Sequence, residues 1–245
     1  MSQIIPCHTQ VYKIHELSTA WRNGMLCLYQ KYYADSNERT FFADLDNKDY
    51  VILMQNSDEN ICGFSTLQVL ETSFQGHSIR VIFSGDTIVH HTYWGKQDSG
   101  MFFLRLSGQI WQQADMPLYW LLISKGHRTY RYLSIFTKKY FPNFRKDASV
   151  WQQDLTHHLA KQQFGDSYNA STGVLSFNPP RERLKDVWTN IPNQHSHLPD
   201  VRFFLQKNPG FIHGDELVCL AELSPDNLKA RAKRIFLQGA HASQA

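Results

Sequence analysis

Three apolar runs decide the fold: Tyr50-Val51-Ile52-Leu53-Met54, Ile61-Cys62-Gly63-Phe64-Ser65-Thr66-Leu67-Gln68-Val69-Leu70 and Ile79-Arg80-Val81-Ile82-Phe83-Ser84-Gly85-Asp86-Thr87-Ile88-Val89. The runs are rich in β-branched and aromatic residues, and short polar segments separate them. We therefore predict three consecutive strands joined by short turns, which form an antiparallel meander. The weak alternation of Gln10 to Ile14 predicts an additional edge strand.

The segments around the meander carry helix signals. Ser18 is a good N-cap for a helix with one apolar face, and a short second helix is predicted over Glu38 to Leu45. Asp98 or Ser99 can cap a helix after the meander. The run Leu118 to Ile123 is apolar on both sides, which is typical of a central parallel strand.

The second half of the chain is less regular. A helix is predicted over Arg128 to Tyr140, and Ser149-x-x-Gln152 is a capping box for another that ends at Gly165. The remaining predictions are strands over Gly173 to Phe177, Val201 to Leu205 and Glu216 to Leu223, a loop over 178–200, and a last helix from Ser224-Pro225 to about Leu237.

Composition places the chain among soluble globular proteins. Its 245 residues are 42% hydrophobic and 19% charged, and a net charge of +3 does not by itself indicate a nucleic-acid partner. No window approaches 18 consecutive apolar residues, and the N-terminus lacks the features of a signal peptide. The four cysteines have no paired spacing, which is typical of reduced thiols, so we expect a cytoplasmic protein.

Three local sequences resemble the GCN5-related N-acetyltransferase superfamily, and the order of predicted elements agrees with it. Ile61 to Leu67 resembles the family's third strand, and Ile88 to Lys96 resembles the end of its fourth strand and the turn into its cofactor loop. Leu133 to Phe141 resembles the family's fourth helix. The resemblance covers about residues 8–145.

The resemblance implies an α/β (α+β) fold: a mixed, mostly antiparallel central sheet flanked by helices, with a C-terminal extension. Residues 1–145 would form the acyl-CoA-binding core. Residues 146–245 would complete the sheet and add the extension within one compact domain.

The resemblance also implies that acetyl-CoA or another acyl-CoA is the co-substrate. The backbone of Val89 and His90 would pair with its pantetheine arm. The loop before the next helix would hold its pyrophosphate, because unpaired amides and the helix dipole favour anions there. The residues of that loop are Gly95, Lys96, Gln97, Asp98, Ser99 and Gly100. Trp94 and Gln97 stand where the family has an arginine and a glycine.

The expected chemistry is direct attack of an amine on the thioester in a ternary complex, and a carboxylate or a water held by it would accept the amine proton. Asp86 is the candidate, since it is the carboxylate in an otherwise apolar strand; the alternative is a turn or bulge made by Gly85-Asp86. Ser84 would hold a water or the substrate. The family's tyrosine acid corresponds to Phe136 here, so Tyr140 or Tyr130 would replace it, although core packing is the competing explanation for Tyr140.

The stretch Lys125 to Lys146 contains seven Lys and Arg residues and no Asp or Glu. Three interpretations remain open: a solvated helix face, contacts to the cofactor 3′-phosphate, and a nucleic-acid surface. The last would make the chain a non-catalytic binding protein of this fold, with nucleic acid or a protein as its partner.

Histidines raise a metal hypothesis that the sequence does not favour. His195-Ser196-His197 can chelate from a loop, but no third ligand and no cysteines at short spacing accompany it. We therefore predict no metal site.

The resemblance favours an N-acyltransferase that takes its acyl group from CoA or from an acyl carrier protein. The acceptor would be an amine of a small molecule or a protein. The aromatic residues beyond 145 form either a layer around the acyl group or acceptor, or a homodimer interface.

Overall fold

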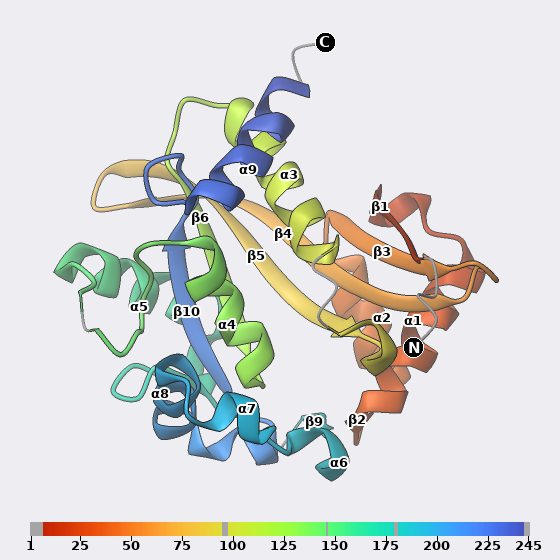
Figure 1. The fold of residues 1–245 in the computed structure, drawn as a ribbon. Coiled ribbons are helices and arrows are strands. Elements are labelled where there is room, and N and C mark those ends of the chain that lie inside the picture. Colours follow the sequence, from red (N-terminus) through yellow and green to blue (C-terminus); the bar gives the residue numbers. More distant parts are fainter. Residues whose placement is uncertain (1–6, 95–97, 146, 179–180, 243–245) are drawn as a thin grey trace.

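A large mixed sheet forms the centre of the molecule in the computed structural model, which describes residues 7–94, 98–145, 147–178 and 181–242. Its strand order is β1-β3-β4-β5-β6-β10-β8-β7 (Figure 1). Within that sheet, β5 and β6 run parallel and the other described pairs are antiparallel. The predicted fold class, a mostly antiparallel mixed sheet with flanking helices, is confirmed.

The meander and the strands around it lie close to their predicted ranges. The strands of the large sheet are β1 (Cys7–Lys13), β3 (Tyr50–Asn56), β4 (Ile61–Phe74), β5 (His77–Val89), β6 (Leu118–Ser124), β7 (Tyr168–Asn169), β8 (Val174–Leu175) and β10 (Glu216–Glu222). The short strands β2 (Tyr33–Ala34) and β9 (Arg183–Leu184) pair separately.

The helices are α1 (Thr19–Tyr32), α2 (Glu38–Asp46), α3 (Asp98–Gln112), α4 (His127–Phe136), α5 (Val150–Phe164), α6 (Asp186–Thr189), α7 (Asn193–Ser196), α8 (Pro199–Lys207) and α9 (Ala230–Ala242). The predicted caps are confirmed at two of them. Ser18 Oγ accepts a hydrogen bond from Trp21 N, and Ser149 Oγ accepts one from Gln152 N, so both hydroxyls satisfy an amide of the first turn.

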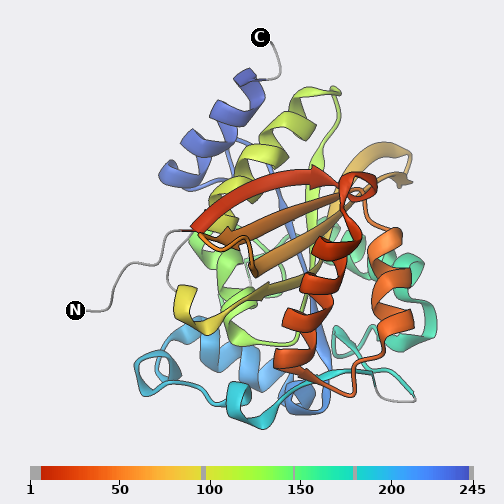
Figure 2. The same ribbon diagram turned by 90° about the vertical axis from the view of Figure 1, so that its right-hand side faces the viewer.

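The two faces of the sheet carry different helices. Helices α3, α4 and α9 lie over one face of the sheet (Figure 1). Side chains of these helices and of α8 share one core cluster with Ile82 and Leu122. On the opposite face, α1 and α2 pack on β3 and β4, and α5 packs on β5, β6 and β10 (Figure 2). No helix of the described residues is long and apolar enough to cross a membrane.

Helices α3 and α9 cross in backbone contact. A Cβ added to Gly108 would lie 1.9 Å from Phe236 O, and one added to Gly239 would lie 1.9 Å from Arg105 O. Only residues without a side chain fit at this crossing.

Two predicted helix ends are wrong for one shared reason. Helix α4 ends at Phe136 rather than Tyr140, and α9 begins at Ala230 rather than at Ser224-Pro225. Asn227 binds the extended segment after α4: its Oδ1 accepts from Lys139 N and its Nδ2 donates to Lys139 O, both at 2.9 Å. These contacts keep both segments out of their helices.

The predicted strand Val201 to Leu205 is also wrong, because these residues lie in α8. Val201 and Phe204, three positions apart, are the fully buried pair, which is the spacing of one helix face. Pro199 occupies the first helical position, where its missing N–H costs nothing. The loop predicted over 178–200 contains β9, α6 and α7.

Candidate functional site

Strands β5 and β6 part before β5 ends. Their parallel pairing runs from Arg80 and Leu118 to Ser84 and Leu122 and stops there. Beyond that point, Thr87 to Val89 remain paired with β4, while β6 continues beside β10. The edge of β5 that faced β6 therefore has no strand partner in its last five residues.

A β-bulge lies at the point where the strands part. Ser65 is paired with Thr87 and Leu67 with Ser84, so Thr66 of β4 stands opposite both Gly85 and Asp86 of β5. One extra residue in β5 reverses the alternation of its side chains. The bulge offered as an alternative for Gly85-Asp86 is therefore present, and it directs Asp86 toward the face that carries α1, α2 and α5.

A cavity of about 740 Å³ passes through the gap between the two strands. Its walls come from both faces of the sheet. Helices α1, α2 and α5 line it on one side and α4 on the other, and the last five residues of β5 lie between them. The segment around β9 covers it, because β9 pairs with β2 and Lys185 N donates to Tyr32 O at 2.9 Å. This volume is in the range of small-molecule sites.

Asp86 faces this cavity, and no described residue donates a hydrogen bond to its carboxylate. The side chain is partly accessible from the cavity but surrounded by protein on its other sides. Desolvation raises its pKa to about 7; Lys125 opposes that change, and Asp44, Glu182 and Glu216 add to it. An acid with this pKa can hold or release a proton near neutral pH.

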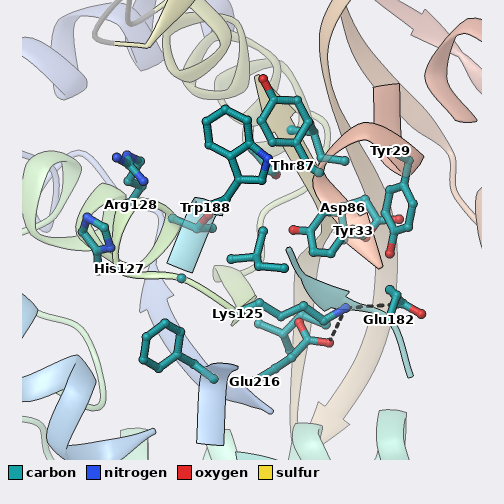
Figure 3. Close-up of a pocket in the computed structure, with 18 of the residues that line it drawn as sticks. Tyr29, Tyr33, Asp86, Thr87, Lys125, His127, Arg128, Glu182, Trp188 and Glu216 are labelled. Carbon is teal, nitrogen blue, oxygen red and sulfur yellow. Dashed lines mark hydrogen bonds and ion pairs between the residues drawn. The ribbon is translucent and has the colours of Figure 1, made fainter. Parts of the chain in front are cut away.

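Lys125 lies between two carboxylates at the end of β6, as Figure 3 shows. Its Nζ is 2.8 Å from Glu182 Oε1 and 3.4 Å from Glu216 Oε1, and it is 5.3 Å from the centre of the Tyr33 ring. Burial alone would lower the pKa of Lys125, but Glu216 and Glu182 raise it above its usual value. Lys125 is therefore a buried ammonium held in place by an ion-pair network.

Aromatic side chains line the same part of the cavity. The rings of Tyr29 and Tyr33 stack at 4.6 Å, and the Tyr29 hydroxyl is hydrogen-bonded to Glu182. Burial raises the pKa of the Tyr29 hydroxyl beyond its ordinary range, so the group stays protonated and donates to the carboxylate. Trp188 of α6 packs on Tyr32 at 4.8 Å.

A second group of side chains surrounds the start of α4. The Arg128 guanidinium lies 3.8 Å from the centre of the Trp94 ring, and both residues line the cavity. His127 Nε2 and His195 Nδ1 are 3.3 Å apart. Desolvation and the nearby Arg128 lower the pKa of His127 to about 3, so the buried imidazole is neutral. Arg128 therefore presents a positive charge at this end of the cavity.

Two of the predicted catalytic residues lie outside the cavity lining. Ser84 Oγ accepts from Trp120 Nε1 at 2.8 Å on the opposite face of the sheet from Asp86. Tyr140 is fully buried in the core, and its hydroxyl donates to Asp200 Oδ1 at 2.6 Å. The core-packing explanation therefore fits Tyr140. Tyr130 is also a core residue, and its hydroxyl donates to Pro142 O.

Only some of the predicted cofactor-binding residues line the cavity among the residues that the structure describes. Val89 lines the cavity, but its carbonyl accepts from Trp94 Nε1 at 2.8 Å, and His90 N donates to Cys62 O at 2.8 Å. Ser99 and Gly100 are buried against Tyr132 and Phe136 of α4 rather than lining the large cavity. Gly95, Lys96 and Gln97, and the side chain of Asp98, lie outside the described residues.

The described residues of the basic stretch differ in their environments. Lys125 is buried, Lys138 Nζ donates to Asp226 O, and Arg145 pairs with Asp147 at 3.0 Å. Arg128 and Arg131 are the members of this stretch, besides Lys125, that line the cavity. Lys125 is therefore not part of an exposed basic face, and the nucleic-acid interpretation stays a prediction for the other residues of the stretch.

The described ranges contain no group of three or more His, Cys, Asp or Glu side chains arranged to hold a metal ion. His195, the other member of the proposed pair with His197, contacts His127.

The sequence did not point to the carboxylates around Lys125. Glu182 belongs to a segment predicted as a loop, and Glu216 to the polar start of a strand. They meet because β10 adds beside β6 and β9 pairs with β2. A glutamate at the start of an otherwise apolar strand was the available signal, since such a buried charge requires a partner.

No protein-family model and no curated protein matches the sequence. Among solved structures, one that resembles this chain is a conserved protein of unknown function from Enterococcus faecalis V583, described as a probable N-acyltransferase. The two are 12% identical with a TM-score of 0.40, and the match covers 54% of this chain and 33% of that one. The chain thus spans about a third of that structure's length.

Two other solved structures resemble the chain to a similar degree. A GNAT-family N-acetyltransferase from Escherichia coli in complex with CoA is 8% identical with a TM-score of 0.37, covering 51% of this chain and 66% of that one. An acyl-CoA N-acyltransferase from Pseudomonas aeruginosa is 14% identical with a TM-score of 0.38, covering 54% and 88%.

Proposed function

We propose that this chain is an N-acyltransferase that moves an acyl group from an acyl-CoA, or from an acyl carrier protein, to an amine. The observation that carries the proposal is the position of Asp86: its carboxylate lies in the cavity where β5 and β6 part and has a pKa near 7. A thioester arm can enter between the parted strands, and the acceptor amine can meet it beside this carboxylate.

The reaction would run by direct attack in a ternary complex. Asp86, directly or through a water, takes the proton from the attacking nitrogen; the new N–C bond forms and the C–S bond breaks. A carboxylate with a pKa near 7 is about half ionised at neutral pH, so it is both available as a base and basic enough to take the proton. This is the step for which the bulge at Gly85-Asp86 positions the side chain.

The thioester arm would lie along the free edge of β5. Gly85 to Ile88 have no strand partner on that side, whereas the Val89 carbonyl and the His90 amide are already engaged. The arm would thus pair with residues between Gly85 and Ile88, whereas the resemblance implied pairing with Val89 and His90. Backbone groups left without partners inside a protein are well suited to an amide-containing ligand.

Cofactor phosphates would meet Arg128 at the start of α4. The guanidinium lies 3.8 Å from the centre of the Trp94 ring and lines the cavity. Guanidinium groups bind phosphate through charge-assisted hydrogen bonds. Ser99 and Gly100, which are covered by α4, would not contact the phosphates directly.

Tyr132 would replace Tyr140 as the donor to the departing thiolate. It lines the cavity on α4, and burial raises the pKa of its hydroxyl while a hydrogen bond with Ser99 opposes that rise. The proton passes from the Tyr132 hydroxyl to sulfur and is recovered from solvent.

The test is a thermal melt of the full chain with acetyl-CoA, with longer acyl-CoAs and with free CoA. Ligands that bind the folded state raise the melting temperature as their concentration rises. Release of free thiol in the presence of a primary amine then reports turnover. A melting temperature that no thioester moves would remove acyl transfer from consideration.

A further inference from the structure

We infer that the acceptor carries a second positive charge: the cavity is built to hold a diammonium ligand or a longer polyamine, with one amino group at Asp86 and the other among the neighbouring carboxylates and tyrosines. This rests on the proposed function and specifies the substrate class of the same site.

The charges around Asp86 do not balance. Four carboxyl groups face this part of the cavity, Asp44, Asp86, Glu182 and Glu216, while the ammonium groups paired with them are Lys48 and Lys125. Asp44, Glu182 and Glu216 all act on Asp86, so the four groups share one electrostatic environment. Arg181 also lines the cavity and acts on Glu216, so the site has four carboxyl groups and three cationic side chains, an excess of one carboxyl group.

Both lysine ammonium groups are already held by carboxylates other than Asp86. Lys48 Nζ is 2.7 Å from Asp44 Oδ1, and its side chain is almost fully buried over the Phe83 ring. Lys125 is shared between Glu182 and Glu216. Asp86 has no donor among the described residues and faces the cavity, so it is the group that a bound cation would meet first.

The walls suit an alkylammonium group. Lys125 already lies 5.3 Å from the centre of the Tyr33 ring, which demonstrates the geometry in which this wall accepts a cation. Tyr29, Tyr32 and Phe41 line the same region and provide apolar surface for a methylene chain. Arg128 and Arg131 lie on the α4 side, so the cationic end of the cavity is left for the phosphates of the donor.

The experiment compares three probes of similar length and different charge: n-butylamine, 1,4-diaminobutane and 4-aminobutanoate. Calorimetric titration of the full chain without any thioester gives their dissociation constants. We expect the diamine to bind at least about tenfold more tightly than the monoamine, and the amino acid to bind more weakly than both, because one added charge near unpaired carboxylates changes binding by this order. Salt should reduce the difference.

Glu182→Gln and Asp44→Asn should each reduce the diamine preference by about threefold or more. Asp44 has 48% of its side chain exposed, and Asn keeps an oxygen that can accept from Lys48 Nζ, so the Asp44→Asn variant should fold even if loss of Glu182 unfolds the chain. Glu59→Gln, a matched change at an exposed turn, should leave the preference unchanged.

Equal affinities for the three probes, or a preference unaffected by both carboxyl variants, would overturn the inference. The proposed function fails differently, because it predicts thioester binding and thiol release regardless of which amine is preferred. A protein that acylates n-butylamine as readily as the diamine would retain the function and lose this acceptor class.

Discussion

Ser84 and Asp86 are two residues apart on β5, yet their side chains leave opposite faces of the sheet. Ser84 accepts from Trp120 under α3 and α4, whereas Asp86 faces the cavity beside α1 and α2. In a regular strand, residues i and i+2 share a face. The extra residue opposite Thr66 reverses that rule and separates the structural serine from the candidate base.

Asp86→Asn should lower kcat by about a hundredfold to ten-thousandfold, because loss of a general base removes that factor. Acyl-CoA should still raise the melting temperature of the variant. In the unmodified chain, kcat should rise with pH up to about 7 and then level, since Asp86 must be ionised to accept a proton. Asp154→Asn, a matched change on the exposed side of α5, is the control. A variant with full activity would exclude Asp86 as the base.

The same substitution should stabilise the protein at high pH. Folding raises the pKa of Asp86 from 3.8 to about 7, so the folded state binds more protons than the unfolded state between these values, and stability falls as pH rises through that window. Asp86→Asn removes this loss, and we expect a gain of about 1–3 kcal/mol in the free energy of unfolding at pH 8 and little change at pH 4. Urea unfolding at the two pH values measures it; equal differences at both would contradict the raised pKa.

Lys125→Met should destabilise the fold by about 3–5 kcal/mol, because it leaves Glu182 and Glu216 buried without their cation. The double variant Lys125→Met/Glu216→Gln should recover part of the loss. Lys161→Met breaks an exposed pair with Asp166 and should change the free energy of unfolding by less than about 0.5 kcal/mol. Chemical denaturation compares the three. Equal effects of Lys125→Met and Lys161→Met would mean that the buried network does not hold the fold.

Gly108→Ala should cost about 2–4 kcal/mol, because the added methyl group meets the Phe236 carbonyl of α9 and the two helices have to move apart. Gln112→Ala, at an exposed position of the same helix, should be near neutral. Thermal unfolding of both variants tests the crossing. A Gly108→Ala protein as stable as the parent would show that α3 and α9 can separate without loss.

Arg128→Gln should weaken binding of acetyl-CoA by about tenfold, because one charge-assisted contact to phosphate is lost. Binding of an acetylated pantetheine that lacks the nucleotide should not change, and this distinguishes a phosphate contact from a general effect on the cavity. Arg105→Gln, at an exposed position on α3, provides the control. Equal losses for both ligands would assign Arg128 to the pantetheine or the wall instead.

Local sequence was sufficient for most of the architecture. The apolar runs of the meander, the caps Ser18 and Ser149, and the two-sided run Leu118 to Ile123 correctly predicted β3 to β6, α1 and α5. It failed where one segment is held by another distant in sequence. Asn227 ends α4 through contacts to Lys139, and helix-forming residues between Thr137 and Tyr140 cannot reveal that partner.

The sequence by itself determined strands β3 to β6, helices α1 and α5 and the carboxylate within the apolar run of β5. Those features follow from periodicity and capping, which neighbouring residues decide. The position of that carboxylate where β5 leaves β6 was implied only by the family resemblance. Only the tertiary structure decided that Asp86 and not Ser84 enters the cavity, that Tyr140 is a core residue, and that Lys125 meets Glu182 and Glu216. The physical reason is that strand pairing across more than fifty residues, and one extra residue in one strand, set which side chains share a low-dielectric space.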